Sequence, residues 1–229
     1  MSFVLEIAVE SVAAAQAAER AGADRIELCA NLSVGGVTPS ERMMQEARAC
    51  LHIPIFAMIR PRAGNFVYDR DEFTAMRSQI ATARSLKMDG IVVGILSAEN
   101  AVDIGRTHAL VESASPLPVT FHRAFDQTPD LAKALEDAIA SGATRLLTSG
   151  GAANAPNGRD KLRDLVRSAG SRIIVMPGAG IQAENFADLR RATEAKEFHA
   201  GLGTVLPYGH SDFARFEREI RKIVTQKSK

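Results

Sequence analysis

The sequence predicts an α/β protein, a single-domain (β/α)8 TIM barrel over residues 1–229, and three observations support this fold class. Short apolar, β-branched runs alternate with helical patterns eight times along the chain. The runs are almost continuously hydrophobic, which is typical of parallel strands buried on both faces. Several runs also end on Glu, Arg or His, and side chains of this kind gather at the carboxyl ends of barrel strands.

The elements follow from these patterns. Strands are expected at 3–8, 25–29, 54–60, 91–95, 118–122, 145–148, 172–176 and 197–200. Helices are expected at 11–21, 39–50, 70–87, 103–113, 130–141, 159–168, 182–192 and 211–226. The last of these is amphipathic and is expected to pack its apolar face on the barrel. A doubly wound open sheet is the alternative, but the first strand-helix turn lacks a glycine-rich fingerprint.

Residues at the element boundaries agree with this assignment. Thr38-Pro39 and Thr128-Pro129 are interpreted as a capping hydroxyl followed by proline at the first helical position. Gly22 and Gly142 follow helices, where the chain needs a left-handed residue. The segments around these two glycines resemble each other and lie four units apart. Two half-barrels of four units would produce that offset, which favours the closed barrel.

Composition limits the possible partners. Apolar residues make up 46% of the chain, and 28 Lys and Arg balance 27 Asp and Glu, for a net charge of +1. This balance argues against nucleic acid and anionic membranes as partners. The two cysteines, Cys29 and Cys50, do not form a disulfide framework. No apolar run approaches the roughly 20 residues of a membrane span, and the start shows no signal peptide, so a cytoplasmic location is expected.

Alternation along the strands predicts which polar side chains face the lumen. The inward-facing residues at the barrel mouth are expected to be Glu6, Glu27, Cys29, Arg60, His122, Thr148 and His199. Glu6, Glu27, Arg60, His122 and His199 form the candidate catalytic set. A structural interpretation stays open for each residue, because either glutamate could pair with Arg25 or Arg60 and His122 could simply hydrogen-bond a carboxylate.

A second pattern suggests an anion site. Arg60 precedes a loop that contains Arg62 and a glycine, and arginine forks bind carboxylate or phosphate. Glycine-containing turns follow the last three strands, where backbone amides of many barrels hold phosphate. The candidate anion-binding residues are Arg62, Ser149, Gly150, Gly178, Gly180 and Gly201.

Together, several motifs make the chain resemble the CutC family of copper homeostasis proteins over about residues 4–200. The motifs that carry this resemblance lie at 22–31, 35–40, 58–62, 118–126, 147–150, 175–178 and 197–199. The resemblance implies a cytosolic TIM barrel, a homo-oligomer and a role in intracellular copper handling. It implies no established catalytic activity.

The resemblance also implies a candidate Cu(I) ligand. A cuprous site has been proposed in the family from two cysteines, one on each of the first two strands. Cys29 matches the second position, whereas Ala8 occupies the first, and Ala200 stands where many relatives have a further cysteine. Cu(I) prefers soft ligands, so one thiolate would hold it less well than two. Cys29 could instead be a buried, inert thiol, and Cys50 is interpreted as structural.

Three functions therefore remain open. The first is copper binding, with Cys29 as ligand. The second is an enzyme acting on a small anionic or phosphorylated substrate, in which Glu27 or His122 is the general base and Arg60 stabilises negative charge. The third is a non-catalytic scaffold that binds a metabolite. A divalent-metal site of Glu6, Glu27, His122 and His199 is a lesser alternative.

Overall fold

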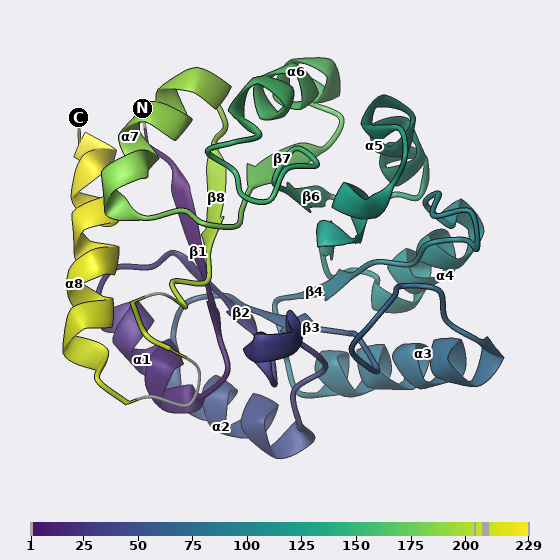
Figure 1. The fold of residues 1–229 in the computed structure, drawn as a ribbon. Helices are drawn as coiled ribbons and strands as arrows, with labels where there is room; N and C mark the ends of the chain where they lie inside the picture. Colours follow the sequence, from purple (N-terminus) through teal and green to yellow (C-terminus); the bar gives the residue numbers. More distant parts are fainter. Residues whose placement is uncertain (1, 204, 208–210, 229) are drawn as a thin grey trace.

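The computed structural model describes residues 2–203, 205–207 and 211–228, in which eight parallel strands alternate with eight helices (Figure 1). The strands are β1 Val4–Val9, β2 Arg25–Leu28, β3 Ile55–Met58, β4 Gly90–Val93, β5 Val119–Phe121, β6 Arg145–Thr148, β7 Ile174–Pro177 and β8 Glu197–Ala200. The helices are α1 Val12–Arg20, α2 Glu41–Cys50, α3 Arg70–Ser85, α4 Ile104–Ala114, α5 Leu131–Ala140, α6 Arg159–Ala169, α7 Ala183–Thr193 and α8 Phe213–Val224. Three short 3₁₀ turns complete the fold: η1 Leu32–Val34, η2 Arg123–Gln127 and η3 Thr225–Ser228.

The strand order confirms the barrel. Neighbouring strands pair in parallel in the order β7-β6-β5-β4-β3-β2-β1-β8, and the end strands β7 and β8 contact each other, so the sheet is nearly closed. In Figure 1 the helices surround the strands. The open-sheet alternative is wrong, because a doubly wound sheet reverses its strand order part-way, whereas here β1 joins β2 on one side and β8 on the other.

Two apolar layers follow from the alternation of side chains. Leu5, Ile7, Ile26 and Leu28 face the helices and are fully buried in the large core between strands and helices. Cys29, Phe56, Met58 and Val92 form a small separate cluster inside the barrel. Burial on both faces explains why these strands show no polar alternation in the sequence.

The predicted glycine turns occur where expected. Gly22 and Gly142 have φ values of 93° and 83°, which only glycine adopts without steric cost. Two residues later, Asp24 and Thr144 accept a backbone N–H from β1 and β5, at 2.7 and 3.0 Å. The two related segments therefore share their geometry as well as their sequence.

The predicted helix caps at Thr38 and Thr128 are wrong by two residues. Ser40 caps α2, and Asp130 caps α5, each with its side-chain oxygen accepting from the first turn. The hydroxyl of Thr38 instead accepts the backbone N–H of Arg60 and ties the loop before α2 to the end of β3. The proline thus lies before the cap in both cases.

The terminal helix α8 packs on the barrel as the amphipathic pattern predicts. Phe216, Ile220 and Ile223 are buried, and α8 contacts α1 and α7. The two termini lie near each other beside α7 and α8 (Figure 1). Across the described parts of the chain, no helix has both the length and the apolar character needed to cross a membrane.

Phe56 fills the lumen below the mouth. Two guanidinium groups lie close to its ring, that of Arg25 at 4.8 Å and that of Arg145 at 5.2 Å from the centroid. On the neighbouring strand Gly90 leaves room for the ring, because a Cβ there would lie 2.5 Å from it. The close approach therefore explains the glycine at this position.

This contact gives a prediction about stability. Gly90→Ala should lower the free energy of unfolding by about 1–3 kcal/mol, because the added methyl group overpacks the lumen against Phe56. Chemical denaturation monitored by circular dichroism measures the change. Gly105→Ala is the matched control, since its Cβ would meet nothing closer than 3.9 Å and alanine favours the helix there. Equal stability of Gly90→Ala and wild type would contradict this packing.

Candidate functional site

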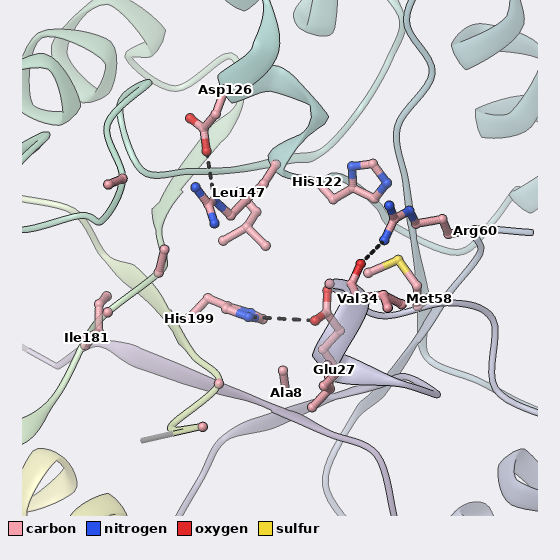
Figure 2. Close-up of a pocket in the computed structure, with 18 of the residues that line it drawn as sticks. Ala8, Glu27, Val34, Met58, Arg60, His122, Asp126, Leu147, Ile181 and His199 are labelled. Atoms are coloured by element: carbon pink, nitrogen blue, oxygen red, sulfur yellow. Dashed lines mark hydrogen bonds and ion pairs between the residues drawn. The ribbon is translucent and has the colours of Figure 1, made fainter. Parts of the chain in front are cut away.

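A cavity of about 1140 Å³ lies at the carboxyl ends of the strands (Figure 2). Its lining includes four of the five candidate catalytic residues: Glu27, Arg60, His122 and His199. Ala8 and Met58 line it as well. Thr148 was predicted to face the lumen, but Leu147 lines the cavity in its place. The predicted alternation of β6 was therefore wrong by one residue. The hydroxyl of Thr148 turns away and donates to Asp126 at 2.5 Å.

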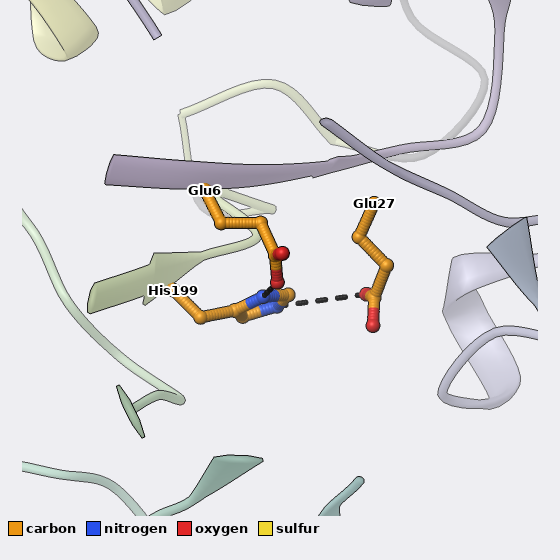
Figure 3. A group of neighbouring side chains, drawn as sticks. All are labelled: Glu6, Glu27 and His199. Carbon is orange, nitrogen blue, oxygen red and sulfur yellow. Dashed lines mark hydrogen bonds and ion pairs between the residues drawn. The ribbon is translucent and has the colours of Figure 1, made fainter. Parts of the chain in front are cut away.

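His199 lies between two buried carboxylates (Figure 3). Its Nδ1 is 2.7 Å from Oε1 of Glu6, and its Nε2 is 3.7 Å from Oε2 of Glu27. Strand pairing produces this arrangement, because Glu6 of β1 is in register with His199 of β8, and Ala8, two residues further along β1, is in register with Glu27 of β2. Glu6 does not line the cavity itself, but it contacts His199, which does.

The pKa values of these groups diverge. Burial alone would raise the pKa of Glu6, but the hydrogen bond from His199 and the charge of Arg25 outweigh it and lower this pKa to about 2. Burial raises the pKa of Glu27 to about 6. Burial also opposes the charged form of His199, yet the charge of Glu27 and the hydrogen bond to Glu6 raise its pKa above the usual value. Glu27 is thus the carboxylate suited to accept a proton near neutral pH.

The same three side chains have atoms within 4.8 Å of one another, which is the kind of donor set that holds a divalent cation. In the structure Nδ1 of His199 hydrogen-bonds Glu6 instead, while its Nε2 lies 3.7 Å from Glu27. His122 is not part of this group, so the four-residue metal site considered from the sequence is not assembled.

Below the mouth, Arg25 connects Glu6 to a second carboxylate. Its Nε donates to Glu6 at 2.5 Å and its Nη2 donates to Glu197 at 2.6 Å, while Arg145 also donates to Glu197 at 2.9 Å. The sequence interpretation left open a pair between a glutamate and Arg25, and the structure shows it for Glu6. Glu197 and Arg145 were missed. Glu197 lies two residues before the inward-facing His199, whereas the error of one residue at Thr148 hid the inward direction of Arg145.

His122 is held as a neutral hydrogen-bond donor. Its Nδ1 accepts the backbone N–H of Ala124 at 3.1 Å, so the proton of the neutral ring lies on Nε2. Burial and the charge of Arg60 lower its pKa to about 3, which excludes it as the general base at neutral pH. Gly94 leaves room for the ring, because a Cβ at that position would lie 2.3 Å from it. Between the two candidate bases left open by the sequence, the structure therefore favours Glu27.

Arg60 is a buried cation that holds the surrounding loops. Its Nη1 donates to the carbonyls of Val34 and Gly36, and its Nη2 donates to that of Gly64, all at 2.9–3.0 Å. Its guanidinium lies 4.8 Å above the ring of Phe66. Within the described part of the chain no carboxylate forms an ion pair with it. A buried positive charge without an anionic partner is unfavourable unless a ligand supplies one.

Three polar atoms of the cavity residues are buried without a hydrogen-bond partner among the described residues. They are Oε1 of Glu27, Nε2 of His122 and Nε of Arg60. An unpaired buried polar group destabilises a protein by about 1–3 kcal/mol, and native structures contain few of them. The occurrence of an acceptor, a neutral donor and a cationic donor around one cavity indicates a site built for a ligand.

A protein-family comparison assigns the chain. Residues 3–204 match the model of the CutC family. The chain belongs to the CutC family. A CutC family protein of Chromobacterium violaceum is 48% identical over 200 residues, which cover 87% of this chain and 81% of that protein. The family resemblance inferred from the sequence motifs is thereby confirmed.

Solved structures agree with this assignment. The crystal structure of the "Putative Copper Homeostasis Protein CutC" from Streptococcus agalactiae matches this CutC chain with a TM-score of 0.82 and 36% identity. The match covers 86% of this chain and 98% of that one. Phosphoribosylanthranilate isomerase from Thermotoga maritima matches 99% of this chain and 98% of its own with a TM-score of 0.64 at 12% identity, which shows the shared barrel fold alone.

The candidate anion-binding residues divide into two groups. Gly180 and Gly201 of this CutC barrel line the cavity. Arg62, Ser149, Gly150 and Gly178 do not appear in that lining. The guanidinium of Arg62 is engaged by Glu72 and by the carbonyl of Val67 instead.

The turn after β6 is held by Asp126, which sequence reasoning missed. Its carboxylate accepts hydrogen bonds from the backbone N–H groups of Ser149 and Gly151 and forms an ion pair with Arg123. Gly150 donates its own N–H to Thr148. These amides are therefore occupied by the protein. The sequence did contain a signal for Asp126, since it is the last residue of the motif at 118–126 that also contains His122.

The amide of Gly178 is also occupied, because it donates to the carbonyl of Thr148 at 2.9 Å. A Cβ at Gly178 would lie 2.4 Å from Leu147 and 3.4 Å from His199. Close packing of the lumen thus accounts for this glycine without an anion.

Cys29 is fully buried beneath the mouth. Its Sγ lies 3.6 Å from Oε2 of Glu27, and it packs with Met58 and Phe56. Burial, followed by the charge of Glu27, raises the pKa of the Cys29 thiol well above its usual value. Cys50 is exposed at the end of α2.

The position of Glu6 gives a prediction about pH dependence. Its pKa lies below the usual 4.5, so its charge stabilises the fold above about pH 4.5, and this contribution is lost as the pH falls toward 2. Glu6→Gln should therefore lower the free energy of unfolding by about 3 kcal/mol at neutral pH and by progressively less below pH 4.5. Urea unfolding across this range measures it. The exposed Glu41→Gln is the control, and a pH-independent loss in Glu6→Gln would contradict the assignment.

Proposed function

We propose that the barrel mouth binds a small anionic molecule and performs acid–base chemistry on it, with Glu27 as general base and His122 as neutral hydrogen-bond donor. The three unpartnered atoms around the cavity carry this proposal. Arg60 supplies positive charge to the ligand, and the amides near Gly180 and Gly201 lie within the same lining.

His199 has a supporting role in this function. The charge of Glu27 and the hydrogen bond to Glu6 raise the pKa of His199, and in its charged form His199 favours the ionised form of Glu27. Burial acts in the opposite direction on Glu27. The resulting pKa of about 6 leaves Glu27 mostly ionised at neutral pH and basic enough to accept a proton.

Copper handling is the second candidate function, and family membership favours it. The donor set does not fit a two-thiolate Cu(I) site, because Ala8 stands at the partner position and the buried thiol of Cys29 resists deprotonation. Met58 is the one soft side chain that packs with Cys29 in the described cluster.

Anion binding should depend on Arg60. Arg60→Gln should weaken the binding of glycerol 3-phosphate at least about tenfold, because it removes a charge-assisted hydrogen bond. Glu27→Gln should bind as tightly as wild type or more tightly, since it removes a like charge. Titration calorimetry measures both. Arg62→Gln, on the same loop but outside the lining, is the control, and undiminished binding by a folded Arg60→Gln protein would refute the proposal.

The donor set also predicts the outcome of a Cu(I) competition titration. We expect Cys29→Ser and Cys50→Ser to compete with a chelator about as well as wild type, and Ala8→Cys to gain at least roughly tenfold in affinity by supplying a second thiolate. A tenfold loss confined to Cys29→Ser would instead establish Cys29 as a copper ligand and favour the second function.

A further inference from the structure

We infer that the substrate is an enolisable carbonyl compound that carries a phosphate or carboxylate group, and that Glu27 removes a proton from the carbon next to its carbonyl. This inference rests on the proposed function and names the chemical class of its ligand. Three observations support it: the three unpartnered atoms, the charge around them, and the side chains that line the same cavity.

The base and the donor lie on different sides of the cavity. Glu27 comes from β2 and lies beside His199, whereas His122 comes from the end of β5 and lies near Arg60 (Figure 2). A carbonyl compound between them would present its C–H bond to Oε1 of Glu27 and its oxygen to Nε2 of His122. Both atoms lack other partners in the described part of the chain and are themselves buried, so a ligand that satisfies both has to draw the two side chains toward the cavity.

The identity of the donor selects the reaction. A neutral imidazole with its proton fixed on Nε2 stabilises an enolate by hydrogen bonding, and pairing it with a carboxylate base is a known solution for proton abstraction next to a carbonyl. The hydrogen bond from Ala124 and the contact with Gly94 hold the ring in this tautomer and position. An imidazole that had to accept a proton, as hydrolysis by a histidine base requires, would need a free Nδ1 or Nε2 lone pair, and His122 has neither.

The remaining side chains argue against covalent chemistry. No lysine occurs among the described lining residues, so a Schiff base has no donor there. Cys29 is buried, has a raised pKa and donates toward Glu27, which excludes a thiolate nucleophile. Proton transfer between carbon and a carboxylate needs none of these groups.

The step is balanced without a redox partner or a co-reactant. The C–H bond breaks and its proton forms an O–H bond with Glu27, while the C–H electrons form the C=C bond of the enolate. The carbonyl π electrons move to oxygen, where Nε2–H of His122 donates to the developing charge. Return of the proton from Glu27 to the same carbon restores the substrate. Where that carbon carries a hydroxyl group, the hydroxyl proton passes to the former carbonyl oxygen and Glu27 returns its proton to the former carbonyl carbon, which gives the isomer.

The charge of Arg60 defines the rest of the ligand. Its guanidinium is buried, 4% exposed as a residue, and forms no ion pair within the described chain. Its Nε–H has no hydrogen-bond partner among the described residues and suits a phosphate or carboxylate oxygen. The like charge of Glu27 would repel that group, which orients the ligand with its carbonyl end toward the base.

The experiment follows deuterium uptake from D2O by NMR with three probes. Dihydroxyacetone phosphate and 3-hydroxypyruvate are the phosphate and carboxylate arms, and uncharged dihydroxyacetone tests the anion requirement. Wild type should catalyse C–H exchange in at least one anionic probe and at least about tenfold more slowly in dihydroxyacetone. Glu27→Gln should reduce exchange by at least about 100-fold. His122→Phe should reduce it strongly, whereas His122→Gln, whose amide can donate, should recover part of it.

Glu41→Gln, which lies on the exposed surface of α2, is the matched control and should exchange like wild type. Binding of glycerol 3-phosphate and of the three probes is measured in parallel by calorimetry. Exchange that persists in Glu27→Gln overturns the inference, as does the absence of exchange with every probe while the anions still bind. The second result leaves the proposed function standing. Failure of wild type to bind any of these anions overturns the proposed function together with the inference.

Discussion

The buried pair between Arg25 and Glu6 is the interaction on which the site depends. Desolvating two charges is unfavourable unless each finds several partners, and here Arg25 joins Glu6 to Glu197 while His199 completes the coordination of Glu6. The contributing residues come from β1, β2 and β8, so the network forms only when β8 returns to pair with β1. Closure of the barrel and assembly of the charges are therefore one event.

This network leaves one carboxylate, that of Glu27, with an oxygen that has no partner among the residues described. The two oxygens of Glu6 accept from Arg25 and contact His199, and Oε2 of Glu197 accepts from both Arg25 and Arg145. Glu27 lies at the edge of the network and keeps one oxygen unpaired. The difference in pKa between the two neighbouring glutamates has the same origin, because hydrogen bonds and charges from His199 and Arg25 outweigh burial at Glu6, whereas burial dominates at Glu27.

Much of this was predictable from the sequence. Near-continuous apolar runs predicted the eight strands, and their alternation placed Glu27, His122 and His199 in the lumen. The order of short motifs predicted the family. These inferences succeed because side-chain direction along a strand is a local property with a period of two residues, and it survives any change in the rest of the fold. The one-residue error at Thr148 shows its limit at the end of a short strand.

The hydrogen-bond partners were decided only by the tertiary structure. Sequence patterns offered Gly178 and Ser149 as anion-binding amides, but Thr148 and Asp126 occupy them. They also left His122 open as a base, and a backbone N–H from Ala124 settles its tautomer. Such outcomes depend on which groups approach within about 3 Å across strands and loops far apart in the chain, a distance that no local pattern encodes. The sequence alone determined the kinds of groups at the mouth, and the closed barrel decided which of their atoms stay free to act.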